Sequence, residues 1–368
     1  MKQNIMKNKK TYFFGFLALL VMTLYPHSKH SFDSYRELFE DKTICITGGT
    51  GFIGRTLLKQ ILQFNPKKVV IVSRDEVKHY KIQKKFRDHR IQSIVGDVRD
   101  YNTMLMVTKG VDMVLHTAAL KRIDMLEFHT LESIYTNVQG TINVARACME
   151  NNVATALLVS TDKACSPINT YGACKFLAEK IFTNFGAPNE STRFIVVRYG
   201  NVLKSTGSVI PFFCEKIKNN KPVPLTDERM TRFFISKQQA IELIFKALKY
   251  GHGGEVFVPR IPSFKITDLI HALQDKIGIT TPIEVIGLRP GEKIHELMIN
   301  ETEVPRTYVK EDLYIITPSV SADETRKAYA QHGRKLTLND LHEYSSGTSL
   351  LSKEDLIALL DAYLIVKK

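Results

Sequence analysis

Short apolar runs separated by helical patterns dominate the first half of the chain. The runs at 42–47, 68–73, 91–95, 111–116, 156–160 and 193–198 have the length and composition of strands buried on both faces. Helical patterns lie between them, the clearest at 56–64 and 131–151. Strands and helices that alternate at this spacing predict an α/β fold with a Rossmann-type, doubly wound parallel sheet.

The pattern loosens after about residue 204. Helices are predicted at 236–250 and 267–277, with strands at 255–258 and 282–286. We expect a Rossmann domain over 41–204 and a smaller mixed substrate-binding domain over 205–318, with some of that chain returning to the Rossmann sheet. A tail follows over 319–368, and its terminal helix, 353–366, is expected to pack on the protein rather than form a partner surface.

Residues 1–40 differ from the rest of the chain. Lys7, Lys9 and Lys10 precede an apolar run, Tyr12–Tyr25, that is short for a membrane span of about 20 residues. The stretch after it lacks the small residues of a signal-peptide cleavage site. We expect an uncleaved anchor that contacts the membrane through 12–25, with a signal peptide or an over-long start as alternatives. The lysines would place a spanning segment's folded domain across the membrane, yet a cytoplasmic folded domain fits the expected chemistry better.

Charge and cysteine content change this picture little. The 368 residues carry a net charge of +13, but the basic residues are scattered, and the cluster at 78–90 fits a solvated helix face. We therefore expect an acidic small ligand and no nucleic acid. The five cysteines form no C-x-x-C motif and no metal-like pairing with histidine, which favours reduced thiols and no metal site.

A glycine-rich turn follows the first strand. Its spacing is G-x-x-G-x-x-G, and a helical pattern comes next, which is the context of a dinucleotide site even though the common spacing is G-x-G-x-x-G. Glycines permit a tight turn, and the helix N-terminus attracts a pyrophosphate. The predicted contacts are Gly48, Gly49, Thr50, Gly51, Phe52, Ile53 and Gly54.

The end of the second strand indicates which dinucleotide binds. Ser73 and Arg74 offer a hydroxyl and a guanidinium that suit the 2′-phosphate of NADP, whereas NAD usually meets an acid there. NADP is therefore preferred, although Asp75 could bind a ribose hydroxyl of NAD instead. Further cofactor contacts are predicted at later strand ends and in the catalytic block, namely Asp97, Val98, Ala118, Ala119, Lys121, Tyr171, Lys175 and Val202.

The block Ser160–Lys175 carries the densest chemistry. Tyr171 and Lys175 are four residues apart on a predicted helix, so that they share a face, and the ammonium is expected to lower the pKa of the phenol. Thr161, Asp162 and Lys163 lie at the carboxyl end of the preceding strand, where open α/β sheets hold their ligands.

These motifs together resemble the extended short-chain dehydrogenase/reductases over about residues 41–318. Within that group, Ser160–Ala164, Arg198–Val202, Met230–Phe233, Arg289–Glu296 and the tail Tyr344–Ser346 are similar to the inverting UDP-N-acetylglucosamine 4,6-dehydratases. The resemblance implies dehydration of UDP-N-acetylglucosamine at C4 and C6 with inversion at C5. The product would be an L-arabino 4-keto sugar on the way to pseudaminic-acid-type sugars for surface glycans or flagellin glycosylation.

The resemblance also implies roles for individual residues. Tyr171 takes the O4 proton with help from Lys175 and Thr161, Lys163 is the base at C5, and Asp162 is the acid for the C6 hydroxyl. Lys163 must be partly neutral for this, and we expect burial beside positive charge to lower its pKa. A simple ion pair with Asp162 is the alternative. The implied substrate contacts are Lys121, Asn201, Arg232, Arg289 and Glu292, and the family suggests a homo-oligomer.

Three other functions stay open at this point. A retaining UDP-sugar 4,6-dehydratase or a UDP-hexose 4-epimerase would use the same scaffold, but an epimerase has no need for Asp162 and Lys163. Some relatives carry Met in place of Tyr171, so the tyrosine favours the pseudaminic type. A non-catalytic NADP-binding scaffold is disfavoured because both Tyr171 and Lys175 are present.

Overall fold

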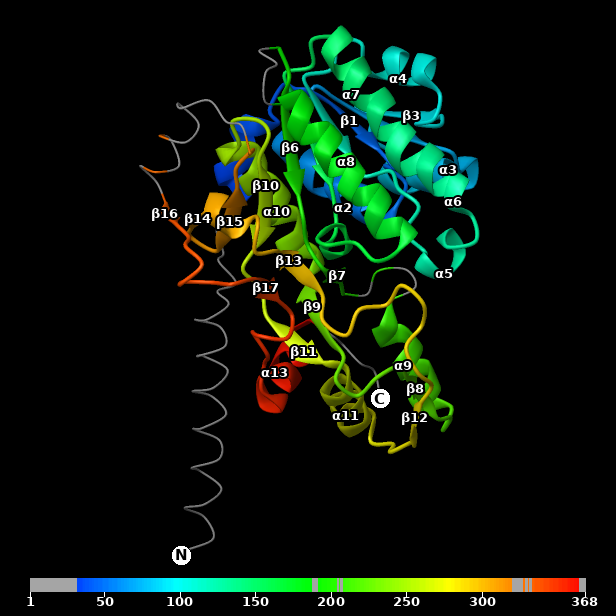
Figure 1. The fold of residues 1–368 in the computed structure, drawn as a ribbon. Helices are drawn as coiled ribbons and strands as arrows, with labels where there is room; N and C mark the ends of the chain where they lie inside the picture. The colour runs from blue at the N-terminus through cyan, green and yellow to red at the C-terminus, as the bar shows by residue number, and fades with distance from the viewer. Residues whose placement is uncertain are drawn as a thin grey trace, which may run out of the picture.

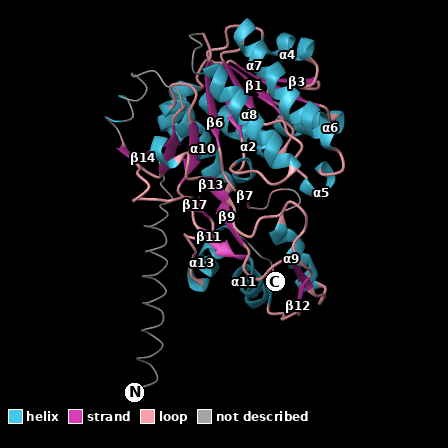
Figure 2. Cartoon of the chain, viewed as in Figure 1, coloured by secondary structure: helices cyan, strands magenta, loops and turns pink. Residues whose placement is uncertain are grey.

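A computed structural model describes residues 32–186, 191–203, 205, 208–319, 327, 330 and 333–363 (Figure 1). The predicted anchor at 12–25 lies outside these residues. Among the helices of the described part, none has the length and apolar character that crossing a membrane requires. A large body built on one sheet carries a smaller body beyond the carboxyl ends of its strands (Figures 1 and 2).

In the described residues the large sheet has ten strands, in the order β16-β14-β15-β10-β6-β5-β4-β1-β2-β3. The run from β3 to β10 is parallel, and β15, β14 and β16 add antiparallel pairs at the far edge. The predicted Rossmann-type sheet is therefore confirmed. Its strands are β1 (Thr43–Thr47), β2 (Lys68–Ser73), β3 (Ile91–Val95), β4 (Met113–His116), β5 (Thr155–Val159), β6 (Arg193–Val197), β10 (Val256–Pro259), β14 (Thr307–Lys310), β15 (Leu313–Ile316) and β16 (Arg334–Lys335).

Helices cover both faces of this sheet (Figure 2). On one face α2 packs against α10, and α3 joins them because successive right-handed crossovers in one direction stay on one side. On the other face α7 packs against α4 and α8. The bounds are α2 (Phe52–Ile61), α3 (Glu76–Phe86), α4 (Tyr101–Thr108), α7 (Gly140–Glu150), α8 (Thr170–Gly186) and α10 (Lys237–Tyr250), with short 3-10 helices η1 (Phe32–Leu38) and η2 (Leu62–Phe64).

Strand order reverses between β1 and β4, which are neighbours although β2 and β3 separate them in the chain. Such a switch point leaves a crevice at the carboxyl ends of the strands, where ligands of open α/β sheets bind. The strands are rich in Val, Ile and Leu because both faces are buried, and Ile44, Ile46, Val114 and Leu157 are fully inaccessible to solvent.

The helix predicted over 131–151 contains an irregularity. It consists of α6 (Thr130–Ser133), a π-helical turn η3 (Ile134–Gln139) and α7, after a short α5 (Ile123–Leu126). Helix α2 also begins earlier than predicted, at Phe52, because the glycine turn itself forms its first residues. A π turn shifts the register of side chains within a helix, and here it carries Asn137.

The smaller body has its own apolar core. Strands β7 (Asn201–Val202), β9 (Thr231–Ile235) and β11 (Ser263–Lys265) form one sheet, and β8 (Val223–Leu225) pairs with β12 (Ile283–Val285). Helices α9 (Val209–Lys218), α11 (Ile266–Ile277) and α13 (Lys353–Tyr363) close around them, with Leu269, Leu273, Leu356 and Leu360 buried together. The predicted packing of the terminal helix is thus confirmed.

Before it reaches α13, the tail passes the junction of the two bodies. Strand β17 (Tyr344–Ser345) pairs antiparallel with β13 (Leu297–Ile299), which follows the Arg289–Glu296 segment. The Tyr344 hydroxyl donates to the Ile261 carbonyl (2.7 Å) and accepts from the Ile261 amide (2.9 Å). Residues from the end of the chain are therefore fixed next to the carboxyl edge of the large sheet.

Candidate active site

Three polar residues continue from β5 at the carboxyl edge of the sheet. Thr161 begins a short 3-10 helix, η4 (Asp162–Ala164), and its hydroxyl donates to Asp162 Oδ1 (2.9 Å). Lys163 Nζ donates to the same oxygen (3.1 Å), and the Asp162 side chain is completely buried. The Tyr171 phenol hydrogen-bonds with Thr161, so these four residues form one connected group, called the acid/base cluster below.

The N-terminus of α8 sets Tyr171 against η4. Asn169 Oδ1 accepts from the Gly172 amide and Glu127 Oε1 accepts from the Thr170 amide, both at 2.7 Å, and together they satisfy helix-end donors. A Cβ on Gly172 would lie 2.3 Å from the Lys163 carbonyl oxygen. Glycine at this position therefore permits the close approach of α8 and η4 that joins Tyr171 to the cluster.

The predicted effect of Lys175 on Tyr171 is wrong. Lys175 is buried on α8, and its ammonium donates to the Val159 carbonyl (2.7 Å). Burial lowers the pKa of Lys175 to about 8, against the opposing charge of Glu179. Burial raises the pKa of Tyr171 to about 12, and the cation that opposes this rise is Lys163, not Lys175. A shared helix face brought the two residues near each other but did not make them partners.

Lys163 also differs from expectation. Its ammonium lies 3.1 Å from Asp162 Oδ1 and 3.0 Å from Glu296 Oε1. Burial disfavours the charge, but these two carboxylates outweigh it and raise the pKa of Lys163, so the expected lowering is wrong. The ion pair with Asp162 that the sequence left as an alternative is present, and Glu296 adds a second acid that sequence reasoning did not foresee.

The pKa of Asp162 is raised above that of an ordinary carboxylate. Burial raises its pKa, and Glu296 raises it further, although Lys163 works against both. Among the described side chains, Asp162 Oδ2 is buried without a hydrogen-bond partner. An unpaired buried carboxylate oxygen is costly, and a donor from a bound molecule or a proton on the oxygen would relieve it.

Two of the predicted substrate residues adjoin the acid/base cluster. Arg232 on β9 is buried, with Nη2 3.4 Å from Glu292 Oε1 and Nε 3.8 Å from Glu296 Oε1. Glu292 Oε2 is buried and unpartnered among the described atoms. Asn201 is exposed on β7, and Arg289 is exposed on the loop before Glu292, so neither is joined to the cluster by a bond in the structure.

The glycine turn fits a dinucleotide pyrophosphate. Gly48 has φ +67°, and a Cβ there would lie 2.8 Å from the Ala118 backbone. A Cβ on Gly54 would lie 2.4 Å from the Gly48 carbonyl oxygen, so the turn folds tightly onto the first turn of α2. Gly51 caps α2 without any side-chain hydrogen bond, which leaves the amides of the first turn directed at the crevice.

The end of β2 is built around a buried histidine. Thr50 Oγ1 and Ser73 Oγ are 2.7 Å apart, and His79 Nε2 is 2.9 Å from Ser73 Oγ. Arg74 is exposed beside this group. Asp75 caps α3 by accepting from the Lys78 amide (2.9 Å), so its carboxylate is already engaged. Ser73 and Asp75 are thus both engaged within the protein, and the exposed Arg74 is the residue among the three whose positive charge would suit a 2′-phosphate.

The other predicted cofactor contacts come from segments that follow β3, β4 and β6 of the large sheet. Asp97 accepts from the Arg99 Nε (2.8 Å), which lowers its pKa against the effect of burial. Val98 is buried under α7, and Val202 lies on β7. The loop after β4 is clamped by Asn137, which accepts from the Leu120 amide (2.8 Å) and donates to its carbonyl (2.9 Å). The same loop carries Ala118, which is partly buried, and Ala119 and Lys121, which are exposed.

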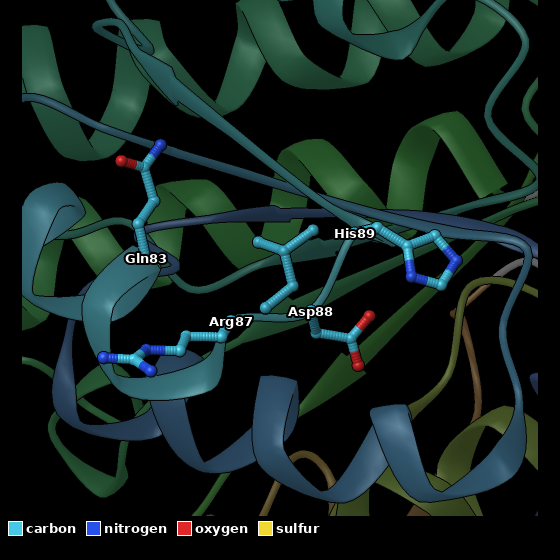
Figure 3. A pocket seen from close by; sticks show the side chains of 5 residues that line it. Gln83, Arg87, Asp88 and His89 are labelled. Atoms are coloured by element: carbon cyan, nitrogen blue, oxygen red, sulfur yellow. The ribbon is translucent and has the colours of Figure 1, made fainter.

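A surface pocket lies at the opposite edge of the sheet. It is lined by Gln83, Arg87, Asp88, His89 and Ile91, where α3 ends and β3 begins (Figure 3). Parallel strands place their amino ends at one edge and their carboxyl ends at the other, so this pocket is remote from the acid/base cluster. We assign it no part in the chemistry.

Sequence reasoning missed two residues that shape the cluster. Glu296 ends a motif that was quoted for its first residues, and only the pairing of β13 with β17 places its carboxylate on Lys163. Gly172 lies inside the Tyr171–Lys175 interval, and the signal that could have identified it is a glycine in the first turn of a helix, where propensity disfavours it.

Comparisons with known proteins agree with this architecture. A family model described as "Polysaccharide biosynthesis protein" matches residues 44–318. A UDP-N-acetylglucosamine 4,6-dehydratase (inverting) of Campylobacter jejuni serotype O:23/36 is 42% identical over 318 residues, which is 84% of this chain and 93% of that protein.

Two further similarities are to a protein with a different printed activity and to a solved structure. A UDP-glucose 4-epimerase of Rickettsia bellii strain RML369-C is 39% identical over 88% of this chain and 96% of that protein. The X-ray structure of Pen from Bacillus thuringiensis superposes with a TM-score of 0.80 at 34% identity, covering 88% of this chain and 98% of that one. The match of one family model across most of the described fold, with relatives that span nearly their whole length, shows that this chain belongs to the polysaccharide biosynthesis protein family.

Proposed function

We propose that the protein is a nucleotide-sugar 4,6-dehydratase that acts on UDP-N-acetylglucosamine with inversion at C5. The observation that carries the proposal is the buried contact between Asp162 and Lys163 beside Tyr171. Oxidation and reduction at C4 alone require a phenol and a lysine on this scaffold. Removal of water needs one more acid and one more base, and the acid/base cluster contains such a pair.

The pair becomes an acid and a base by a single proton transfer. At rest Lys163 is an ammonium and Asp162 a carboxylate, joined by a 3.1 Å hydrogen bond. Movement of one proton along that bond gives a neutral amine and a carboxylic acid, without any exchange with solvent. Burial favours the neutral form of such a pair, and it already raises the pKa of Asp162.

These two forms suit the two halves of the elimination. The Lys163 amine removes the C5 proton, which a ketone at C4 makes acidic, and the Asp162 carboxylic acid protonates the departing C6 hydroxyl so that it leaves as water. The ammonium and the carboxylate are then restored. Return of a proton to the opposite face of C5 would give the inverted L-arabino product.

Tyr171 would take the proton of the C4 hydroxyl at the start of the reaction. Its phenol needs a nearby cation to ionise, because burial raises its pKa, and Lys163 in its ammonium form supplies that charge. Thr161 connects the two groups through its hydroxyl. The order is consistent: Lys163 is charged while Tyr171 acts, and it becomes neutral only for the later step at C5.

A nicotinamide dinucleotide fits the crevice, with NADP as the preferred form. Its pyrophosphate would lie on the amides of the glycine turn at α2, and its 2′-phosphate between Ser73 and Arg74. When bound, it would accept a hydride from C4 and return it at C6. The buried amine of Lys175 lies beside β5 and would hold the nicotinamide ribose.

The sugar nucleotide would bridge the two bodies of the molecule. Arg232 and Glu292 adjoin the cluster, and the unpartnered oxygens of Asp162 and Glu292 would accept from sugar hydroxyls. Arg289 is exposed on the loop before Glu292, and from there its guanidinium would bind the diphosphate. Lys121 and Asn201 would contact the substrate from the β4 loop and β7.

The test is turnover of UDP-N-acetylglucosamine by the full-length protein in deuterated water, followed by NMR. We expect a 6-deoxy-4-keto product of L-arabino configuration with deuterium at C5. A D-xylo product would identify a retaining dehydratase, and recovery of only the C4 epimer would support the epimerase that the Rickettsia relatives suggest. Either result would overturn the proposal.

The variant Lys163→Ala separates dehydratase from epimerase chemistry within the same protein. We expect it to lose dehydration by about 10²-fold or more, the usual contribution of a general base, while binding of NADP in a fluorescence titration is unchanged. Undiminished dehydration in this variant would show that Lys163 is not the base at C5.

A further inference from the structure

Glu296 occupies a position that the proposed reaction does not yet use. Its side chain is buried, with Oε1 3.0 Å from Lys163 Nζ, so that the ammonium lies between two carboxylates. The tail fixes this position: the Glu296 amide donates to Ser346 Oγ (2.9 Å), and the Ser346 amide donates to the Glu296 carbonyl (2.8 Å). A third chain segment, β9, brings the Thr231 hydroxyl within 2.7 Å of Ser346 Oγ.

The two carboxylates on Lys163 are not equivalent. Both are buried, and each has one oxygen without a partner among the described atoms, so the difference between them lies in the cations that they face. Glu296 lies 3.8 Å from the Nε of Arg232, a cation that cannot give up its proton. Lys163 and Arg232 therefore lower the pKa of Glu296 although burial acts against them, whereas the pKa of Asp162 is raised.

We propose that Glu296 is a positioning residue that holds the Lys163 ammonium against Asp162 and, by keeping its own charge, makes Asp162 the group that receives the Lys163 proton. This role in catalysis rests on the proposed dehydratase function. The contacts of Glu296 with Lys163 and Arg232 are present in the protein without any substrate. The step is a proton transfer alone: the Nζ–H bond of Lys163 breaks, the O–H bond of Asp162 forms, and Glu296 remains a carboxylate throughout.

The groups that face Lys163 come from every neighbouring segment. Asp162 and Tyr171 face it from η4 and α8, Glu296 and Lys293 from the segment before β13, and Arg232 from β9. Removal of the Glu296 charge leaves one acid opposite Lys163 and two other cations close by. The remaining balance then favours loss of the ammonium proton at a lower pH.

The direct test measures the ionisation of Lys163 itself, without substrate. The intact protein is acetylated with isotope-coded acetic anhydride at a series of alkaline pH values, and the modification of Lys163 is followed by peptide mass spectrometry. In Glu296→Gln we expect the onset of labelling to move down by about one pH unit or more, the usual effect of one opposite charge. An unchanged onset would overturn the proposal.

Glu292→Gln is the matched control. It removes the same charge from the same segment, but Glu292 pairs with Arg232 and not with Lys163, so the onset of Lys163 labelling should stay in place. An equal shift in both variants would mean that the general charge of the segment, and not the contact with Glu296, sets the state of Lys163. That outcome would also overturn the proposal.

If Glu296→Gln does not fold, as judged by circular dichroism, Glu296→Asp replaces it. Its shorter side chain withdraws the carboxylate from the 3.0 Å contact while the charge is kept, so a smaller downward shift is expected. No shift would contradict the proposal.

A kinetic experiment separates this inference from the function. In Glu296→Gln both limbs of the pH profile of kcat/KM for UDP-N-acetylglucosamine should move to lower pH, because a negative charge beside both Asp162 and Lys163 has been removed. A role in packing alone would reduce the rate without moving the limbs. If the natural protein does not turn over this substrate, the proposed function fails, and the labelling experiment still decides the role of Glu296.

Discussion

At the scale of single residues, the ionisation of a side chain depends on its burial and on the charged groups around it. Lys175 shows this most clearly. It is buried, with a backbone carbonyl as its hydrogen-bond acceptor, and Glu179 one helical turn away provides the opposing charge. Its pKa of about 8 lies well below that of a lysine in water, so folding disfavours its charged form.

This pKa predicts how stability depends on pH. Between about pH 8 and the ordinary lysine pKa, the unfolded chain keeps the Lys175 proton while the folded chain has lost it. The free energy of unfolding should therefore gain about 1.4 kcal/mol per pH unit from this group as pH rises through that window, and nothing below it. Denaturant unfolding of the natural protein and of Lys175→Met should differ by that slope, and parallel curves would contradict the assignment.

The spacing of Tyr171 and Lys175 predicted where these residues lie but not how they ionise. Periodicity places two side chains on one helix face, and in the structure both lie on α8, with Tyr171 in the acid/base cluster and Lys175 on the Val159 carbonyl. Burial is the largest cause of the pKa shift of each residue, and it is opposed by Lys163 for Tyr171 and by Glu179 for Lys175. How deeply a side chain is buried depends on packing between distant segments, so the direction of both pKa shifts was out of reach.

At the scale of elements, the site depends on how closely η4 and α8 approach. Gly172→Ala should force them apart, because its Cβ would lie 2.3 Å from the Lys163 carbonyl oxygen. We expect a loss of about 1–3 kcal/mol in unfolding free energy, as for other overpacked sites, and a larger fall in kcat than in NADP affinity. Ala173→Ser, on the exposed side of the same turn, is the control and should behave as the natural protein does.

The π turn provides a second prediction at this scale. Asn137 satisfies both the amide and the carbonyl of Leu120. Asn137→Leu leaves both groups unpaired, which should cost about 1–3 kcal/mol of stability and loosen the loop after β4. An increase in the Kd for NADP, measured by isothermal titration calorimetry, would accompany it. Unchanged affinity would show that this loop does not contact the cofactor.

Most elements could be predicted because each has a local cause. Most of the parallel strands of the large sheet are apolar runs, and α10 follows its N-cap Ser236, whose side chain forms a capping box with Gln239. The antiparallel strands β14, β15 and β16 were not predicted. The break in the helix over 131–151 could not be predicted, since a π turn is stabilised by contacts such as that of Asn137 with Leu120. The same is true of the early start of α2, which depends on how tightly the glycine turn folds.

At the scale of the whole molecule, a buried charged group links three distant segments. Arg198, after β6, pairs with Glu179 on α8 (2.6 Å) and with Glu303, after β13 (2.8 Å), and it also donates to the Met298 carbonyl (2.7 Å). Although burial alone would raise it, Arg198 lowers the pKa of Glu303 to about 2.

Arg198→Met should therefore destabilise the fold by about 3–5 kcal/mol at neutral pH, because two carboxylates remain buried without a counter-charge. The difference from the natural protein should narrow as the pH falls. Unpaired carboxylates bind protons easily, whereas the natural protein loses the contribution of Glu303 as the pH falls from the ordinary glutamate pKa towards about 2. Chemical denaturation at several pH values measures this, and a constant difference would contradict it.

The pairing of the tail with the rest of the chain was beyond sequence reasoning. Tyr344–Ser346 resembled a known motif, but no pattern indicated that β17 pairs with β13 or that Ser346 fixes Glu296. The smaller body was predicted as a mixed region, and its helices α11 and α13 were placed close to their observed bounds, whereas α9 was not predicted. Its contacts with the acid/base cluster depend on how distant segments pair in the fold, and no sequence pattern indicated that pairing.

The position of Ser346 late in the chain affects the order in which the parts of the site are completed during synthesis. A ribosome releases the nucleotide-binding strands long before it has synthesised residue 346, and domains fold in that order. The nascent chain would thus be able to hold its dinucleotide while Glu296 still lacks the hydrogen bonds that seat it on Lys163. Under the proposed function, catalytic competence would arrive only once residue 346 has been added, so that a chain interrupted before it would bind cofactor without acting on sugar.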